Sequence, residues 1–200
     1  MGRKPTKTTN THMKKYTLSL LLLGRLPGAS HAKRAFLLLC GLSLAGCAHT
    51  YTPKASRPLD PIPEFRVTGE IALKNGQASN DKVVFLKNGA HQWTADRQAW
   101  TDTAIEISKR ELQLRGLLVG VNAKKFITLS VDSVKTEVGW VKIDSTIVMT
   151  AKTADGYSAT YTGRNNSAMV ANLERQWDGV VMRAVAEMLK DPQIIQYLKK

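Results

Sequence analysis

The sequence predicts an α+β fold in which helices cover an antiparallel sheet, with the element order β-β-α-β-β-β-α-α over residues 65–200. Three observations lead to this prediction. Apolar and polar side chains alternate over residues 65–73, which is the period of a half-buried strand. Apolar side chains recur at helical spacing over residues 173–188. Asn-Gly and Asp-Gly pairs stand where hairpin turns would join short strands.

The first half of the predicted domain holds two strands and a helix. The strand at residues 65–73 is followed by a second short strand at residues 83–86, and an Asn-Gly turn comes after each. Thr94 is the expected N-cap of a helix that continues to Arg115. Gly116 then provides the stop signal that is common after a helix.

The second half holds three strands and two helices. Alternating patterns predict strands at residues 127–131, 141–149 and 157–162, and these should form a meander with one solvated face. The helix at residues 173–188 follows. Asp191 and Pro192 are then expected as N-cap and first residue of a short terminal helix.

Charge is distributed unevenly along the 200 residues, of which 43% are hydrophobic, enough for a single domain with a real core. The formal charge is +13, but residues 1–47 hold eight of the 29 basic residues and none of the 16 acidic ones. Without them the chain keeps 21 basic and 16 acidic residues, a net charge of +5. Such a mildly basic domain is not predicted to bind nucleic acid.

An apolar run at residues 35–45 follows two basic residues, Lys33 and Arg34. The run is about a dozen residues long, which is typical of a secretory signal peptide and short of the roughly 20 residues that cross a bilayer. A buried core helix would explain the apolar run, but not the basic flank or the acid-free leader. The sequence therefore predicts export.

The run ends in Leu44-Ala45-Gly46-Cys47, which resembles the lipobox of bacterial lipoproteins. In such proteins the signal peptidase cuts before the cysteine, which carries a diacylglycerol and usually an N-acyl chain. We therefore expect residues 1–46 to be a signal peptide and Cys47 to become the lipidated first residue, anchored to a membrane. No other cofactor is expected.

The residue after the cysteine, Ala48, is not the aspartate that retains many lipoproteins in the inner membrane. By that rule the expected location is the outer membrane, on its periplasmic face. A second apolar run at residues 18–23 is not needed by one signal peptide, so the true start is expected at Met13 or a later codon.

Residues 47–64 are polar and contain four prolines, with neither helical nor strand periodicity after the cysteine. They are predicted to form an extended tether up to roughly 50 Å long, at about 3.1 Å per residue. The periplasmic domain, residues 65–200, is expected to begin near Phe65. It contains no cysteine, so no disulfide is predicted.

The sequence resembles the YajG family of uncharacterised proteobacterial lipoproteins over roughly residues 102–200, and the leader matches in type. The matching residues lie at element ends and in the core pattern. They are Leu114-Arg115-Gly116, Val119-Gly120, Ile127-Thr128-Leu129, Val131, Ile147-Val148-Met149-Thr150-Ala151, Gly156, Ala184-Val185, Met188-Leu189-Lys190-Asp191, Ile194 and Tyr197-Leu198. The resemblance implies an antiparallel sheet covered by helices and supplies no reaction or ligand.

Catalytic and metal-binding patterns are not found in residues 65–200. His91 is the one histidine there and is expected in a solvated loop, so no metal site is predicted. No Gly-x-Ser-x-Gly elbow occurs. Asp132 and Asp144 lie in neighbouring predicted strands and could face each other as a glycosidase pair, or be ordinary solvated residues. We expect no enzymatic activity.

The four tryptophans divide into two pairs. Trp100 and Trp177 fall on the apolar faces of predicted helices and are expected in the core. Trp93 and Trp140 lie beside predicted turns, where an aromatic side chain either anchors a partner or packs at the edge of an element.

Three function classes follow from these patterns. The leading hypothesis is a non-enzymatic binding or assembly module that docks with an envelope protein partner. The alternative is an accessory lipoprotein of a transport system, which binds lipid or substrate between sheet and helices and would need an apolar pocket of more than about 300 Å³. A cell-wall hydrolase would need ionisable groups clustered in a cleft. The sequence does not fix the oligomeric state.

Overall fold

The computed structural model describes residues 47–55, 61–77, 81–121, 123–168 and 172–200. The predicted signal peptide, with Leu44, Ala45 and Gly46 of the lipobox, lies outside these residues. The strands are β1 (Cys47–Thr50), β2 (Glu70–Asn75), β3 (Lys82–Asn88), β4 (His91–Asp96), β5 (Leu118–Val119), β6 (Phe126–Val138), β7 (Lys142–Thr153) and β8 (Ser158–Ala168), and the helices are α2 (Arg97–Leu114), α3 (Leu173–Lys190) and α4 (Pro192–Lys199).

The larger sheet has the strand order β5-β2-β6-β7-β8. β6, β7 and β8 form the predicted antiparallel meander. β2 runs parallel to both β5 and β6, because the chain crosses over between them through α2. The α+β class is thus confirmed, with a mixed sheet in place of an entirely antiparallel one.

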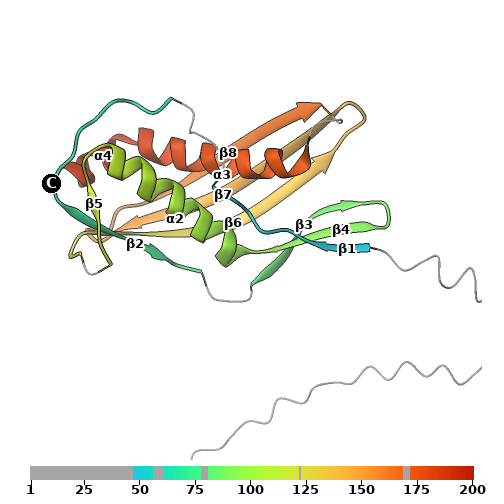
Figure 1. The fold of residues 1–200 in the computed structure, drawn as a ribbon, viewed down its shortest axis with the longest axis horizontal. Helices are drawn as coiled ribbons and strands as arrows, with labels where there is room; N and C mark the ends of the chain where they lie inside the picture. The colour runs from blue at the N-terminus through green and yellow to red at the C-terminus, as the bar shows by residue number, and fades with distance from the viewer. Residues whose placement is uncertain (1–46, 56–60, 78–80, 122, 169–171) are drawn as a thin grey trace, which may run out of the picture. The chain divides into compact units, whose positions relative to one another are not determined.

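Helices α2 and α3 pack on the larger sheet and against each other (Figure 1). The buried face of α3 is the one that the helical spacing predicted, and it includes Trp177, Val181 and Met188. Gly163 in β8 permits the close approach of this helix. A Cβ atom there would lie 2.0 Å from the carbonyl oxygen of Val180, so a larger residue would push the helix off the sheet.

Helix α2 begins two residues later than expected. The predicted N-cap, Thr94, instead lies in β4 and pairs with Val84 of β3, because the hairpin continues further than the sequence pattern suggested. Asp96 is the actual N-cap, and its side chain accepts a hydrogen bond from the backbone N–H of Gln98 at 2.8 Å. Gly116 follows the helix with φ +97°, as its stop role requires.

The smaller sheet has the order β1-β4-β3, and its strand β1 lies within the predicted tether. β1 pairs in parallel with β4 from Cys47 opposite His91 to Thr50 opposite Thr94. The next residue, Tyr51, is buried. Residues 47–51 therefore belong to the folded domain and are not a free tether before Phe65, because β1 pairs with the edge of β4 and the Tyr51 ring is buried.

Candidate functional site

Residues 47–200 present two opposite ends (Figure 1). The first, called the Cys47 end, carries the start of β1, the β3–β4 turn and the β6–β7 turn. The second, called the β5 end, carries the last turn of α2, the strand β5 and helix α4. Exposed apolar side chains occur at both ends, and a different set of contacts lies beneath each.

Cys47 is the first residue of β1 and has an exposed, free thiol. Because its backbone already pairs with His91 of β4, the thiol projects from an ordered strand. A group attached to this sulfur would reach solvent without disturbing the core.

Two histidines and a tryptophan stack next to Cys47. The Nε2 atom of His49 lies 3.1 Å from Nδ1 of His91, and the His49 ring stacks on Trp93 with centroids 4.8 Å apart. Sequence analysis placed His49 in the tether and His91 in a loop, and the structure brings them together on neighbouring strands. The local sequence contains no pattern that would predict a contact between residues 42 positions apart.

Beneath the smaller sheet lies a group of five aromatic side chains, called the aromatic cluster. Its members are Tyr51, Phe85, Trp93, Trp100 and Trp177. The predictions that Trp100 and Trp177 are core residues are confirmed. Trp93, expected at a turn, is half-buried, and its ring centroid lies 6.4 Å from that of Trp177.

Tyr51 joins the N-terminal segment to α3. Its hydroxyl donates a hydrogen bond to the buried Asp178 carboxylate, which also accepts one from the backbone N–H of Lys54 at 2.9 Å. Burial and the Asp178 hydrogen bond raise the pKa of Tyr51 above its ordinary value. The phenol therefore stays neutral and remains a donor, which holds residues 51–54 on the domain.

Trp140 and Val141 form the tip of the β6–β7 turn. Trp140 is 97% exposed and Val141 is 79% exposed. The backbone N–H of Gly139 donates to the carbonyl of Lys142 at 2.8 Å and closes the turn beneath them. Of the two tryptophans expected at edges, Trp140 is thus the one that stands free on the surface.

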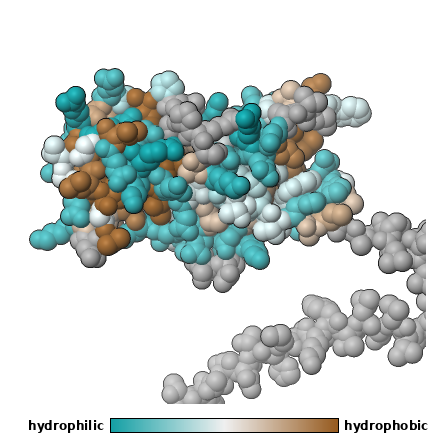
Figure 2. All heavy atoms as spheres, in the orientation of Figure 1, coloured by the Kyte–Doolittle hydropathy of each residue, from teal (hydrophilic) through white to brown (hydrophobic). Residues whose placement is uncertain are grey.

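The β5 end exposes a second group of apolar side chains, called the β5 patch. Its members are Leu114 (74% exposed), Leu118 (71%) and Val121 (88%). Hydrophobic residues also gather at this end in the space-filling view (Figure 2). The patch was not predicted from the sequence, because the two-residue strand β5 is too short to show a period.

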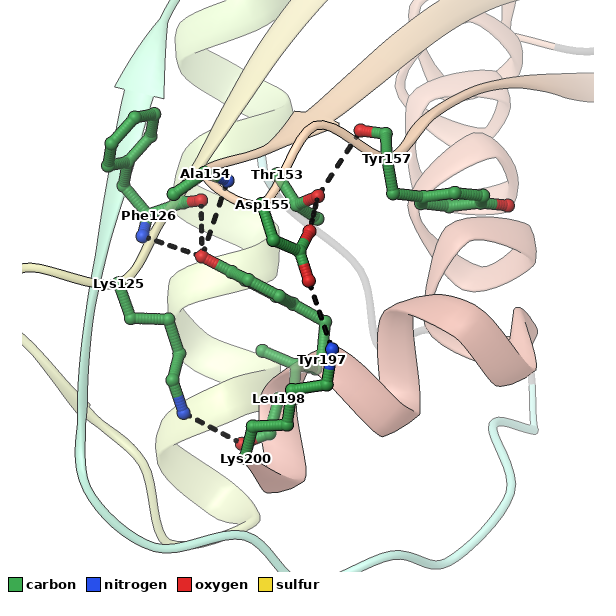
Figure 3. A network of polar contacts seen from close by, with 9 residues as sticks. All are labelled: Lys125, Phe126, Thr153, Ala154, Asp155, Tyr157, Tyr197, Leu198 and Lys200. Atoms are coloured by element: carbon green, nitrogen blue, oxygen red, sulfur yellow. Dashed lines mark hydrogen bonds and ion pairs between the residues drawn. The ribbon is translucent and has the colours of Figure 1, made fainter.

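Polar contacts fix helix α4 at the β5 end (Figure 3). The Tyr197 hydroxyl donates to the carbonyl of Phe126 at 3.0 Å and accepts from the backbone N–H of the same residue at 3.0 Å. The Lys200 ammonium contacts the Asp155 carboxylate at 3.1 Å. Together they attach the C-terminal helix to the start of β6 and the β7–β8 turn.

Asp191 was predicted as the N-cap of α4, and the structure confirms it. Its carboxylate accepts hydrogen bonds from Tyr157 at 2.7 Å, from Tyr161 at 2.5 Å and from the backbone N–H of Gln193 at 2.8 Å. Partial burial acts to raise the pKa of Asp191, but these bonds outweigh it and hold the pKa below its ordinary value. Asp191 is therefore a charged structural residue.

A hollow of about 410 Å³ opens beside β8 and the end of α3. Its lining residues all carry polar groups and are Thr160, Tyr161, Thr162, Glu187, Lys190 and Asp191. Its volume exceeds the threshold set for the transport alternative, but its lining is not that of an apolar lipid pocket.

The structure does not bring Asp132 and Asp144 together. Asp132 lies at a bulge of β6 near Met149, and its carboxylate accepts a hydrogen bond from Thr150 at 2.6 Å. Asp144 pairs with Lys142 at 2.9 Å, at the other end of β7 and roughly 15 Å away along the strand. Among the described residues, no three His, Cys, Asp or Glu side chains are grouped to hold a metal ion.

No helix in the described part of the chain is both long enough and apolar enough to cross a membrane. No family model matches the sequence and no curated protein matches it, so the resemblance to the YajG family stays a prediction.

Several solved structures are similar to this chain at low sequence identity. A protein of the DUF330 family from Xanthomonas campestris is 10% identical, with 76% of this chain and 94% of that chain covered and a TM-score of 0.40. A minor lipoprotein from Acinetobacter baumannii is 14% identical, with 65% and 90% covered and a TM-score of 0.34. A PelC dodecamer from Paraburkholderia phytofirmans is 12% identical, with 70% and 95% covered and a TM-score of 0.33.

Proposed function

We propose that this protein is a bacterial lipoprotein, anchored through Cys47 in the outer membrane, that acts as a non-enzymatic binding or assembly module of an envelope complex in the periplasm. Two features support the anchor. The sequence before Cys47 has the layout of a lipoprotein signal peptide. The Cys47 thiol is exposed, and it belongs to the first residue of β1, so a lipid on it leaves the core intact.

The observation that carries the binding role is the placement of the β5 patch at the end opposite Cys47 (Figure 1). An anchored domain would hold this patch away from the membrane, toward the periplasm. Fully burying one Leu or Val side chain contributes about 1.5–3 kcal/mol, so three such side chains can supply the apolar centre of a protein interface. A protein partner is the ligand that this surface suits.

Site-specific photo-crosslinking in intact cells tests this role. A photoreactive amino acid replaces Leu118 or Val121 in the full-length protein, and the captured proteins are identified by mass spectrometry. The matched control carries the same amino acid at Glu106, an exposed position on α2. We expect one partner at Leu118 and Val121 and not at Glu106.

The proposal fails if a lipidated, envelope-located protein gives no adduct specific to the patch positions. The transport alternative gives a different result. A lipid or small substrate that co-purifies with the protein, and that is lost when residues lining the hollow beside β8 are changed, would place that alternative first.

A further inference from the structure

We propose that the tip of the β6–β7 turn, Trp140 with Val141, inserts into the lipid bilayer surface beside the anchor, so that the Cys47 end of the domain lies directly on the membrane. This inference rests on the proposed lipidation of Cys47. It adds an orientation and a second membrane contact, and it assigns Trp140 to lipid rather than to a protein partner.

The chain between the proposed lipid and the fold is very short. Cys47 itself pairs with His91, and the pairing continues without a break to Thr50 opposite Thr94. Tyr51 is then fixed by its hydrogen bond to Asp178. No free residues separate the acylated sulfur from the sheet, so acyl chains in the bilayer would bring the Cys47 end against the headgroups.

The tip of the β6–β7 turn lies at the Cys47 end of the domain. Figure 1 shows the β6–β7 turn, the β3–β4 turn and the start of β1 at the same end of the domain. A domain held at Cys47 therefore presents Trp140 and Val141 toward the same membrane. Both are among the most exposed large hydrophobic side chains of the described residues, at 97% and 79%.

The side chains at the tip have the chemistry of a membrane interface. Tryptophan is enriched at membrane interfaces because its ring is apolar and its indole N–H can bond to headgroups or water. The neighbouring valine adds an apolar side chain that is mostly exposed to solvent. The hydrogen bond between Gly139 and Lys142 keeps the tip closed, so few degrees of freedom are lost when it inserts.

The charges beside the tip indicate what kind of contact it makes. Lys142 is paired with Asp144 at 2.9 Å, and Lys135 is paired with Glu137. Because these cations have acidic neighbours, the tip is not a basic patch that needs anionic lipid. Insertion should therefore depend weakly on salt, unlike an electrostatic contact.

Quenching of tryptophan fluorescence by brominated lipid tests the contact. The full-length protein is processed in cells, purified, and placed in phosphatidylethanolamine and phosphatidylglycerol vesicles with brominated or ordinary acyl chains. We compare wild type with Trp140→Phe, which removes the fluorophore and keeps an aromatic ring. We expect bromine-dependent quenching in wild type and the loss of most of it in the variant, since Trp100 and Trp177 are buried. Trp93, which is half-buried near Cys47, accounts for the remainder.

Two charged variants form a matched pair. Val141→Asp should reduce the quenching of Trp140, because a carboxylate at the tip opposes insertion. Leu118→Asp, at the β5 end, should leave the quenching unchanged. Circular dichroism checks that each variant is folded, which their exposed positions favour.

The outcomes separate this inference from the lipoprotein proposal, because the mass of the purified protein reports the lipid independently. A lipidated, vesicle-bound protein with equal quenching in wild type and Trp140→Phe overturns the membrane contact and leaves the anchor standing. A protein without lipid that does not bind vesicles overturns both.

Discussion

The two ends of the domain are stabilised by different chemistry. The Cys47 end lies over the aromatic cluster, whose central residue, Trp177, contacts Tyr51, Phe85 and Trp93. The β5 end lies over a polar network in which Tyr197 and Asp191 fix helix α4. Stability at the first end comes mainly from packed aromatic side chains, whereas at the second end hydrogen bonds act together with the buried side chains of Ile194 and Leu198.

At each end, the residues that stabilise the fold are different from the apolar residues that are exposed on the surface. At both ends the displayed side chains, Trp140 and Leu118 among them, are largely outside the core. Substitution of these exposed residues should alter binding and leave the fold unchanged. Substitution of the buried residues beneath them should instead lower the free energy of unfolding, for different reasons at the two ends. The following predictions test this separation.

The largest effect is expected for Trp177→Ala in the aromatic cluster. Trp177 is fully buried, and such truncations lower the free energy of unfolding by about 3–5 kcal/mol. Urea denaturation followed by near-ultraviolet circular dichroism measures the loss. A change below about 1 kcal/mol would contradict the role given to the cluster.

A smaller loss is expected for Tyr51→Phe, which keeps the ring and removes the hydroxyl that bonds to Asp178. Leaving this buried carboxylate short of a donor should cost about 1–3 kcal/mol in the same denaturation experiment. The exposed neighbour supplies the control, as Thr52→Ala should change little. If Tyr51→Phe is as stable as wild type, the hydrogen bond to Asp178 does not help to hold residues 51–54 on the domain.

A pH-dependent effect is expected for Asp191→Asn at the β5 end. The folded protein holds the pKa of Asp191 below the ordinary value of 3.8, so the carboxylate contributes stability that is fully present above that value and is lost as the pH falls through the folded pKa. The unfolding free energies of wild type and variant should therefore differ near neutral pH and converge in acid. Curves that stay parallel down to the acid limit would contradict the assignment.

The smallest change in stability is expected for Leu118→Ser in the β5 patch. Its side chain is mostly exposed, so the free energy of unfolding should stay within about 0.5 kcal/mol of wild type. Capture of the partner by the crosslinker at Val121 should nevertheless be lost. A variant that is stable and still captures the partner would remove the patch from the interface.

Local periodicity predicted the second half of the domain well. The apolar side chains of α3 recur at helical spacing, and Asp191 with Pro192 marked the start of α4, because these signals lie within a few residues of each other. Strand β1 was missed because its partner, β4, lies more than 40 residues away and prolines follow it in the sequence.

The candidate site was predictable only in part. The resemblance of residues 44–47 to a lipobox marked Cys47 as the expected lipidation site, which stays a prediction. Proximity to a turn singled out Trp140, which the structure leaves exposed. Proximity to a turn did not distinguish Trp93 from Trp140, because the packing of Trp93 on Trp177 is a tertiary contact. The β5 patch could not be predicted either, because exposure of Leu118 depends on which elements cover strand β5.

The most direct test of the account is the intact mass of the protein purified from membranes, combined with fragmentation of its N-terminus. The account predicts a chain that begins at Cys47 and carries a diacylglycerol on the sulfur and an acyl chain on the freed amine. A chain that begins elsewhere, or that keeps a free thiol at Cys47, would contradict the anchor and every orientation derived from it.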